Sequence, residues 1–169
     1  MNMDTKQQEA YNADLARIAR QEELLVFEVF NETVAQQLGN LIIERAAEYD
    51  APVVVDIRRG NDPVFFASMP GTSPANADWA RRKRNLVNIL EMPSYAIGLK
   101  AKLGTDFVAM MALDPRDHTP HGGCFPIRVS GAGMVGTVTV SGLPQRDDHK
   151  LATDCIAELL GIALDEARF

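Results

Sequence analysis

Cysteine and histidine are scarce in this chain of 169 residues. There are two cysteines, Cys124 and Cys155, and three histidines, and neither type shows the C-x-x-C or clustered spacing of a zinc site. We therefore expect no structural metal. We also expect no disulfide, because nothing in the sequence indicates export to an oxidising compartment.

Long apolar runs are absent as well. No uncharged stretch of 18 residues occurs, so no membrane-spanning helix is predicted. Residues 1–9 are polar and lack the apolar core of a signal peptide. These absences predict a cytoplasmic protein that does not associate with a membrane.

Basic residues are outnumbered by acidic ones. Lys and Arg total 17 against 23 Asp and Glu, which gives a net charge of −6. A general nucleic-acid binder needs a basic face for phosphate contacts, so this class is excluded, although a small basic ligand site is not. The hydrophobic share of 46% and charged share of 24% are typical of one globular domain, which we place over residues 1–169.

Hydrophobic periodicity predicts a mixture of helices and hairpin-linked strands. Helices are expected over residues 5–20, from Asn31 to about 50, from 74 to about 92, over 94–103, and from 147 or 148 onward. Strands are expected over 24–30, 53–59, 63–68, 125–129 and 134–141, and residues 105–113 are compatible with either structure. Strands joined as hairpins predict an α+β domain with one antiparallel sheet.

Lys83 is the first candidate site residue. At 100° per residue, it falls inside the apolar stripe of the 74–92 helix with Trp79 and Leu86, whereas Arg81 and Arg84 are predicted to point away and Arg82 lies at the border. A buried ammonium is costly unless it reaches water or an anion. Lys83 therefore extends to solvent, forms a structural ion pair, or binds an anionic ligand.

The segment from His118 to Ile127 is the second candidate. Gly122 and Gly123 allow close backbone approach and can present amide groups to an anion, and His121 beside them can transfer protons or bind a ligand. The alternative is that the two glycines only form the turn into a strand.

Other residues carry weaker indications. Trp79, the single tryptophan, is either a core residue or the wall of a site for a flat ligand. Cys124 lies near His121, but no orienting acid can be assigned, so a catalytic cysteine is not favoured. Asp147, Asp148 and His149 chiefly indicate a helix start.

Four segments together resemble an uncharacterised branch of the haem-degrading-domain (GlcG-like) family. They are residues 71–83, 121–127 and 140–144, followed by Asp147-Asp148-His149, within a resemblance spanning about residues 24–163. The resemblance implies a profilin-like fold with a five-stranded antiparallel sheet, a homo-oligomer, and a link to haem or another tetrapyrrole. The resemblance assigns no residue of the haem-handling branch to a position of this chain.

Three function classes follow. The first is a protein that binds haem, a related tetrapyrrole or a small anion; the second is a metal-independent enzyme that uses Lys83 and His121 on a small anionic metabolite; the third is an oligomeric interaction module. The candidate ligand-binding residues are Trp79, Arg82, Lys83, His121, Gly122 and Gly123, with Asn76, Cys124 and His149 as accessory candidates. An axial haem ligand would come from a histidine or a methionine.

Overall fold

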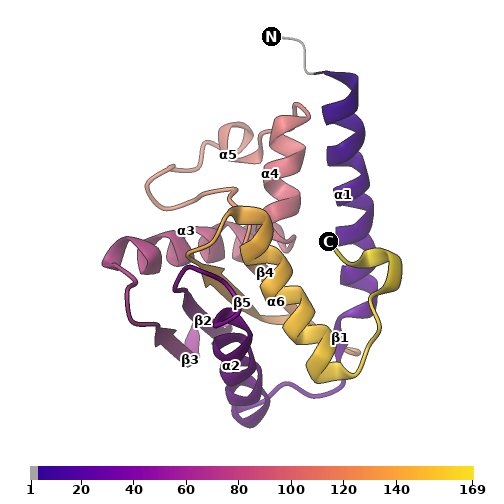
Figure 1. The fold of residues 1–169 in the computed structure, drawn as a ribbon. Helices are drawn as coiled ribbons and strands as arrows, with labels where there is room; N and C mark the ends of the chain where they lie inside the picture. Colours follow the sequence, from indigo (N-terminus) through magenta and orange to yellow (C-terminus); the bar gives the residue numbers. More distant parts are fainter. Residues whose placement is uncertain (1–3) are drawn as a thin grey trace.

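The computed structural model describes residues 4–169 (Figure 1). Its elements, in chain order, are α1 (Thr5–Leu24), β1 (Val26–Phe27), α2 (Glu32–Ala46), β2 (Val54–Arg59), β3 (Asp62–Ser68), α3 (Pro74–Leu90), α4 (Ser94–Lys102), α5 (Phe107–Met110), β4 (Cys124–Val129), β5 (Gly133–Ser141), α6 (Gln145–Leu160) and the short helix η1 (Asp165–Ala167). Within residues 4–169, no helix is long and apolar enough to cross a membrane.

The strands form one five-stranded sheet in the order β1-β4-β5-β2-β3. The four longer strands pair antiparallel, which confirms the predicted α+β class and five-stranded sheet. The strand expected over 24–30 is only two residues long, and it pairs parallel with β4. It ends at Phe27, which pairs with Val129, the last residue of β4. Asn31 then caps α2, accepting a hydrogen bond from the Val34 amide at 3.0 Å.

The two faces of the sheet differ in chemistry. On the face covered by α2 and α6, alternate strand residues form the main apolar core (Figure 1). They include Val53, Val55, Ile57, Phe125, Ile127, Val138 and Val140. This face provides most of the hydrophobic stabilisation.

The opposite face, under α3, contains buried polar groups. Asp56 is 2% exposed and accepts a hydrogen bond from Arg58 Nε at 2.7 Å, and Arg84 Nη1 of α3 pairs with its other oxygen. Arg84 was expected to point away from the stripe of α3. That prediction is wrong, because the buried carboxylate of Asp56 turns the long Arg84 side chain back toward the sheet.

Helix boundaries follow local capping. Ser73 and Asn76 form the capping box of α3, with Pro74 as its first residue. The last helix begins at Gln145, two residues before the predicted start, because Pro144 occupies the N-cap and places Asp147 and Asp148 in the first turn. The undecided segment 105–113 contains the single helical turn α5.

Gly98 of α4 packs directly against the loop before β4. A Cβ at this position would lie 2.2 Å from the Pro120 carbonyl oxygen. We predict that Gly98→Ala lowers the free energy of unfolding by about 1–3 kcal/mol through overpacking, although alanine favours helices. Urea denaturation measures this, with Lys102→Ala on the exposed side of α4 as a control that should change by less than about 0.5 kcal/mol. A Gly98→Ala protein at least as stable as the wild type would contradict the packing.

Candidate functional site

A cavity of about 220 Å³ lies where α3, the loop before β4 and the β5–α6 connection meet. Three residues of α3 line it, namely Asn76, Trp79 and Lys83. The remaining lining residues are His121, Ser141, Gly142, Leu143 and Gln145. The structure therefore brings the predicted residues Trp79, Lys83 and His121 together, from segments about 40 residues apart.

Lys83 forms a buried ion pair at the base of this pocket. Its Nζ lies 2.8 Å from Asp148 Oδ2 and donates a second hydrogen bond to the Val140 carbonyl at 3.0 Å. The two side chains are 4% and 2% exposed. Asp148 Oδ1 accepts from the Leu143 amide at 2.9 Å, and burial, opposed by Lys83, raises the pKa of Asp148. Of the three sequence-based alternatives for Lys83, an ion pair is present and extension to solvent is not.

His121 and Trp79 stack at the rim. Their ring centroids are 4.8 Å apart with the planes tilted by 55°, and the Arg82 guanidinium lies 3.9 Å from the Trp79 ring centroid. Burial lowers the pKa of His121, and the positive charges of Lys83, Arg82 and Lys102 lower it further. His121 is thus a neutral imidazole near neutral pH, in surroundings of positive potential.

The two amide side chains of the pocket are oriented by the backbone. The Asn76 Oδ1 atom accepts from the Ser73 amide at 2.8 Å, and the Gln145 Oε1 atom accepts from the Gly122 amide at 3.2 Å. Because a backbone N–H can only donate, each side chain is fixed with its oxygen toward the protein. Its NH₂ group is left to donate elsewhere, and no hydrogen bond within residues 4–169 uses either one.

Gly122 and Gly123 serve close packing. A Cβ on Gly122 would lie 2.4 Å from the Gln145 carbonyl oxygen, and one on Gly123 would lie 2.8 Å from Lys83 Nζ. Gly123 also has φ +128°, which other residues rarely adopt. Neither of these predicted site residues lines the cavity: the Gly122 amide is bonded to Gln145, and Gly123 leaves room for the ammonium of Lys83.

Cys124 and His149 lie outside the lining. Cys124 is fully buried, and burial raises the pKa of its thiol to about 12, so it is not a thiolate at neutral pH. His149 is also fully buried, with Nε2 2.8 Å from Gln21 Oε1, and burial lowers its pKa to about 3. Neither has the exposure that a ligand contact requires. No group of three or more potential metal ligands occurs in the part of the chain that the structure describes.

The family described as haem degrading protein, HbpS-like, matches residues 30–157. The chain belongs to this family. Among its relatives are UPF0303 proteins of Rhizobium johnstonii, 48% identical over 92% of this chain and 96% of the relative, and of Azotobacter vinelandii, 45% identical over 90% and 93%. The family resemblance seen in the sequence is thereby confirmed.

Solved structures share the HbpS-like fold at low identity. Ybr137w superposes with a TM-score of 0.81 at 23% identity, covering 95% of this chain and 99% of that one. The PduOC:heme complex gives a TM-score of 0.65 at 20% identity over 76% of this chain and 94% of the other, and HbpS gives 0.59 at 18% over 78% and 90%. These likenesses establish the fold of the family in this chain.

The side of the pocket opposite α3, formed by the β5–α6 connection and the start of α6, was not predicted from the sequence. Asp148 was interpreted as a helix-start residue, although an acid in the first turn of α6 was the partner that Lys83 required. Residues 142–144 were noticed only as part of the resemblance, and Gln145 showed no pattern of its own. The periodicity of one segment does not predict which distant segment will pack against it.

We predict that Lys83→Met destabilises the protein by about 3–5 kcal/mol at pH 7, because Asp148 is left buried without its cation. The folded-state pKa of Asp148 would then lie still higher above its unfolded value, so the folded state binds the extra proton. The loss of stability relative to the wild type should therefore become smaller as pH falls and larger as pH rises through the pKa of Asp148. Thermal denaturation between pH 4 and 8 measures this.

The matched variant is Lys83→Met combined with Asp148→Asn, which removes both charges. It should recover much of the lost stability and show little pH dependence. Equal melting temperatures for the wild type and Lys83→Met at pH 7 would contradict the role of the pair.

Proposed function

We propose that this HbpS-like protein binds a carboxylate-bearing ligand in the pocket of Trp79, Lys83 and His121. The observation that carries the proposal is the excess of hydrogen-bond donors. The NH₂ groups of Asn76 and Gln145 are turned from the backbone, and the Lys83 ammonium has three protons, of which two are used. A ligand rich in hydrogen-bond acceptors, such as a carboxylate, would pair with these donors.

The electrostatics support an anion over a neutral ligand. Lys83 and Arg82 are each paired with a carboxylate, that of Asp148 and that of Asp78, and together with Lys102 they still lower the pKa of His121. A bound carboxylate would in turn favour the protonated imidazole. His121 would then donate a charge-assisted hydrogen bond to it.

The size of the pocket limits the ligand. At about 220 Å³ it is smaller than the roughly 300–1,000 Å³ of sites that enclose drug-sized molecules. It suits a small carboxylic acid, or one carboxylate of a larger molecule whose remainder stays outside. Haem carries two carboxylates, and the HbpS-like family together with the PduOC:heme complex supports it as the second candidate.

For haem, His121 is the histidine best placed as an axial ligand. Its ring is at the exposed rim of the pocket, whereas His149 is buried and the Nδ1 atom of His118 lies 3.1 Å from the Asp114 carbonyl. The chain would supply a neutral imidazole, and the metal chemistry would be that of the cofactor.

Titration with acetate, succinate and benzoate tests the proposal. By linkage, a binding carboxylate should raise the pKa of His121 by about 1 unit, so affinity should increase about tenfold as pH falls through that pKa. NMR of the histidine ring signals measures the shift, and His121→Gln should abolish the pH dependence. No change in the His121 signals with any carboxylate would overturn the proposal for small acids.

Haemin distinguishes the source of the carboxylate. A saturating Soret shift that is lost in His121→Gln, without binding of the small acids, would assign the site to a tetrapyrrole. Binding of benzoate with only non-saturating haemin absorption would assign it to small acids.

We also propose that the chain forms a homo-oligomer through residues 107–113. This seven-residue segment, Phe-Val-Ala-Met-Met-Ala-Leu, is entirely apolar, yet none of its residues is buried, and Met110 and Met111 are 71% and 48% exposed. A contiguous exposed apolar segment of this kind is typical of an interface. The cytoplasmic location and the absence of nucleic-acid binding stay predictions from the sequence.

Sedimentation tests the assembly. At micromolar concentration the wild type should sediment above its 18.5 kDa chain mass, and Met110→Glu with Met111→Glu should shift it toward that mass. Val29→Glu, at a 61% exposed apolar residue elsewhere, is the control and should leave the assembly unchanged. A wild type that sediments as an 18.5 kDa species would contradict the proposal.

A further inference from the structure

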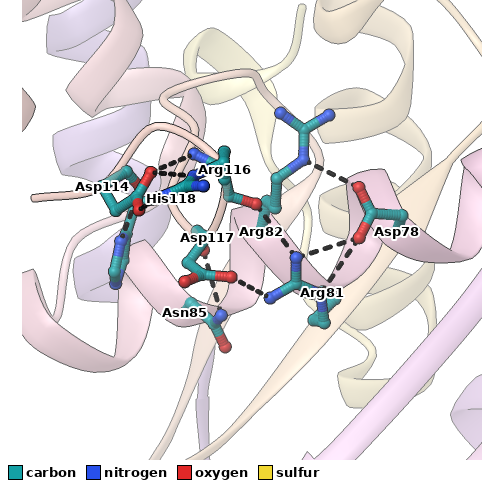
Figure 2. Close-up of polar contacts among 8 residues, drawn as sticks. All are labelled: Asp78, Arg81, Arg82, Asn85, Asp114, Arg116, Asp117 and His118. Carbon is teal, nitrogen blue, oxygen red and sulfur yellow. Dashed lines mark hydrogen bonds and ion pairs between the residues drawn. The ribbon is translucent and has the colours of Figure 1, made fainter.

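The loop that carries His121 is clamped to α3 by polar contacts, which Figure 2 shows. The Arg81 guanidinium donates to Asp117 Oδ1 at 2.8 Å and to the Arg116 carbonyl at 3.0 Å, while Asp78 orients it from within the helix at 2.9 and 3.0 Å. Asn85, one turn further on, donates to the Asp117 carbonyl at 3.0 Å. Arg81 and Asn85, on the same side of α3, therefore both hydrogen-bond to residues 116–117 of the loop.

Residues 114–118 of the loop are also held together by hydrogen bonds among themselves. Asp114 accepts from the Arg116 amide at 2.9 Å and pairs with the Arg116 guanidinium, and the Nδ1 atom of His118 lies 3.1 Å from the Asp114 carbonyl (Figure 2). These bonds fold residues 114–118 into one unit. Displacing Asp117 from α3 would therefore displace the unit as a whole.

All hydrogen bonds that join residues 116–119 to other segments of the described chain go to α3. Besides the contacts of Arg81 and Asn85, the Thr119 amide donates to the Arg82 carbonyl at 3.3 Å. Pro120, the next residue of the loop, packs against Gly98 of α4. The distance between the loop and α3 is thus set by three consecutive attachments to one helix.

The same helix also provides one wall of the pocket. Trp79 and Lys83 line it, and the ring of His121, two residues beyond Thr119, lies against Trp79 with the ring centroids 4.8 Å apart. The Gly122 amide is held by Gln145 on the C-terminal side of His121, so the attachments to α3 fix His121 from its N-terminal side. Loosening the loop would separate His121 from Trp79 without altering any residue that lines the pocket.

We propose that Arg81 and Asn85 are positioning residues, which hold the 114–121 loop closed on α3 and thereby complete the pocket with His121. This inference rests on the proposed function for its effect on ligand binding. Its effect on the position of His121 is independent of any ligand.

The exposure of the clamp separates this role from a structural one. Arg81 and Asp117 are 38% and 54% exposed, and exposed ion pairs contribute little to global stability. Loss of the clamp should therefore release the loop while the core stays folded. Because the contacts are surface contacts, salt should weaken them as well.

The test is the double variant Arg81→Gln with Asn85→Ala, with the pKa of His121 read by NMR without ligand. A released loop moves the ring away from the protein atoms that desolvate it and from Lys83 and Arg82, so the pKa of His121 should rise toward its ordinary value. Benzoate affinity should fall at least tenfold, and the melting temperature should stay within about 2 °C. Arg20→Gln, which removes the exposed Arg20–Glu23 pair on α1, is the control and should change none of the three.

The outcomes distinguish the two proposals. An unchanged pKa of His121 and unchanged benzoate affinity in the double variant would overturn the positioning role, while wild-type binding would leave the proposed function intact. A raised pKa in the variant, with no benzoate or haemin binding by the wild type, would retain the positioning role and overturn the function. Should the double variant melt much earlier, Arg81→Lys, which keeps the charge but loses the forked contact, should still raise the pKa of His121 in part; no change there would count against the clamp.

Discussion

The buried ion pair between Lys83 and Asp148 is the interaction on which the geometry of the pocket depends. It joins α3 to α6 directly, and through its further hydrogen bonds it fixes the Val140 carbonyl of β5 and the Leu143 amide. Gly123 lies so close to the ammonium that any side chain there would displace it. Three stretches that are distant in sequence, around Lys83, around Gly123 and over residues 140–148, therefore meet at one charged contact.

Burying two charges is expensive, and a well-packed apolar pair would often serve stability as well or better. Here the ion pair links the elements around it, because the ammonium also bonds the Val140 carbonyl of β5 and the carboxylate also bonds the Leu143 amide. The arrangement of these elements places Trp79, Gln145 and His121 around a small cavity whose available groups are mostly donors. We regard the neutralised pair as the floor of the site and the rim as the part that selects an anion.

The sequence predicted what depends on local pattern. Hydrophobic periodicity and capping indicated the α3 helix with Ser73 and Pro74 at its start, and four of the five strands were placed to within a few residues. The apolar stripe of α3 singled out Lys83 as a cation that needs either water or an anionic partner. The resemblance identified the family.

What the sequence could not supply depends on contacts between segments. β1 is only two residues long, too short for its sequence to indicate that it pairs parallel with β4. The direction of Arg84 was predicted wrongly because its partner, Asp56, lies on the sheet and not on α3. Gln145 entered the site through the packing of α6 on the glycine loop, and Arg81 became relevant only once the position of Asp117 was known. Helical periodicity predicts which way each side chain points from one helix, but it does not predict which residues of other segments face that side chain.

The most direct test of the account is a crystal structure of the protein with 4-bromobenzoate, using the anomalous signal of bromine to locate the ligand. We predict one site per chain, with the carboxylate between His121 and the amide groups of Asn76 and Gln145 and with Lys83 still paired to Asp148. Ordered bromine elsewhere on the protein with this pocket unoccupied by the ligand, or a carboxylate that binds only after displacing Asp148 from Lys83, would contradict it.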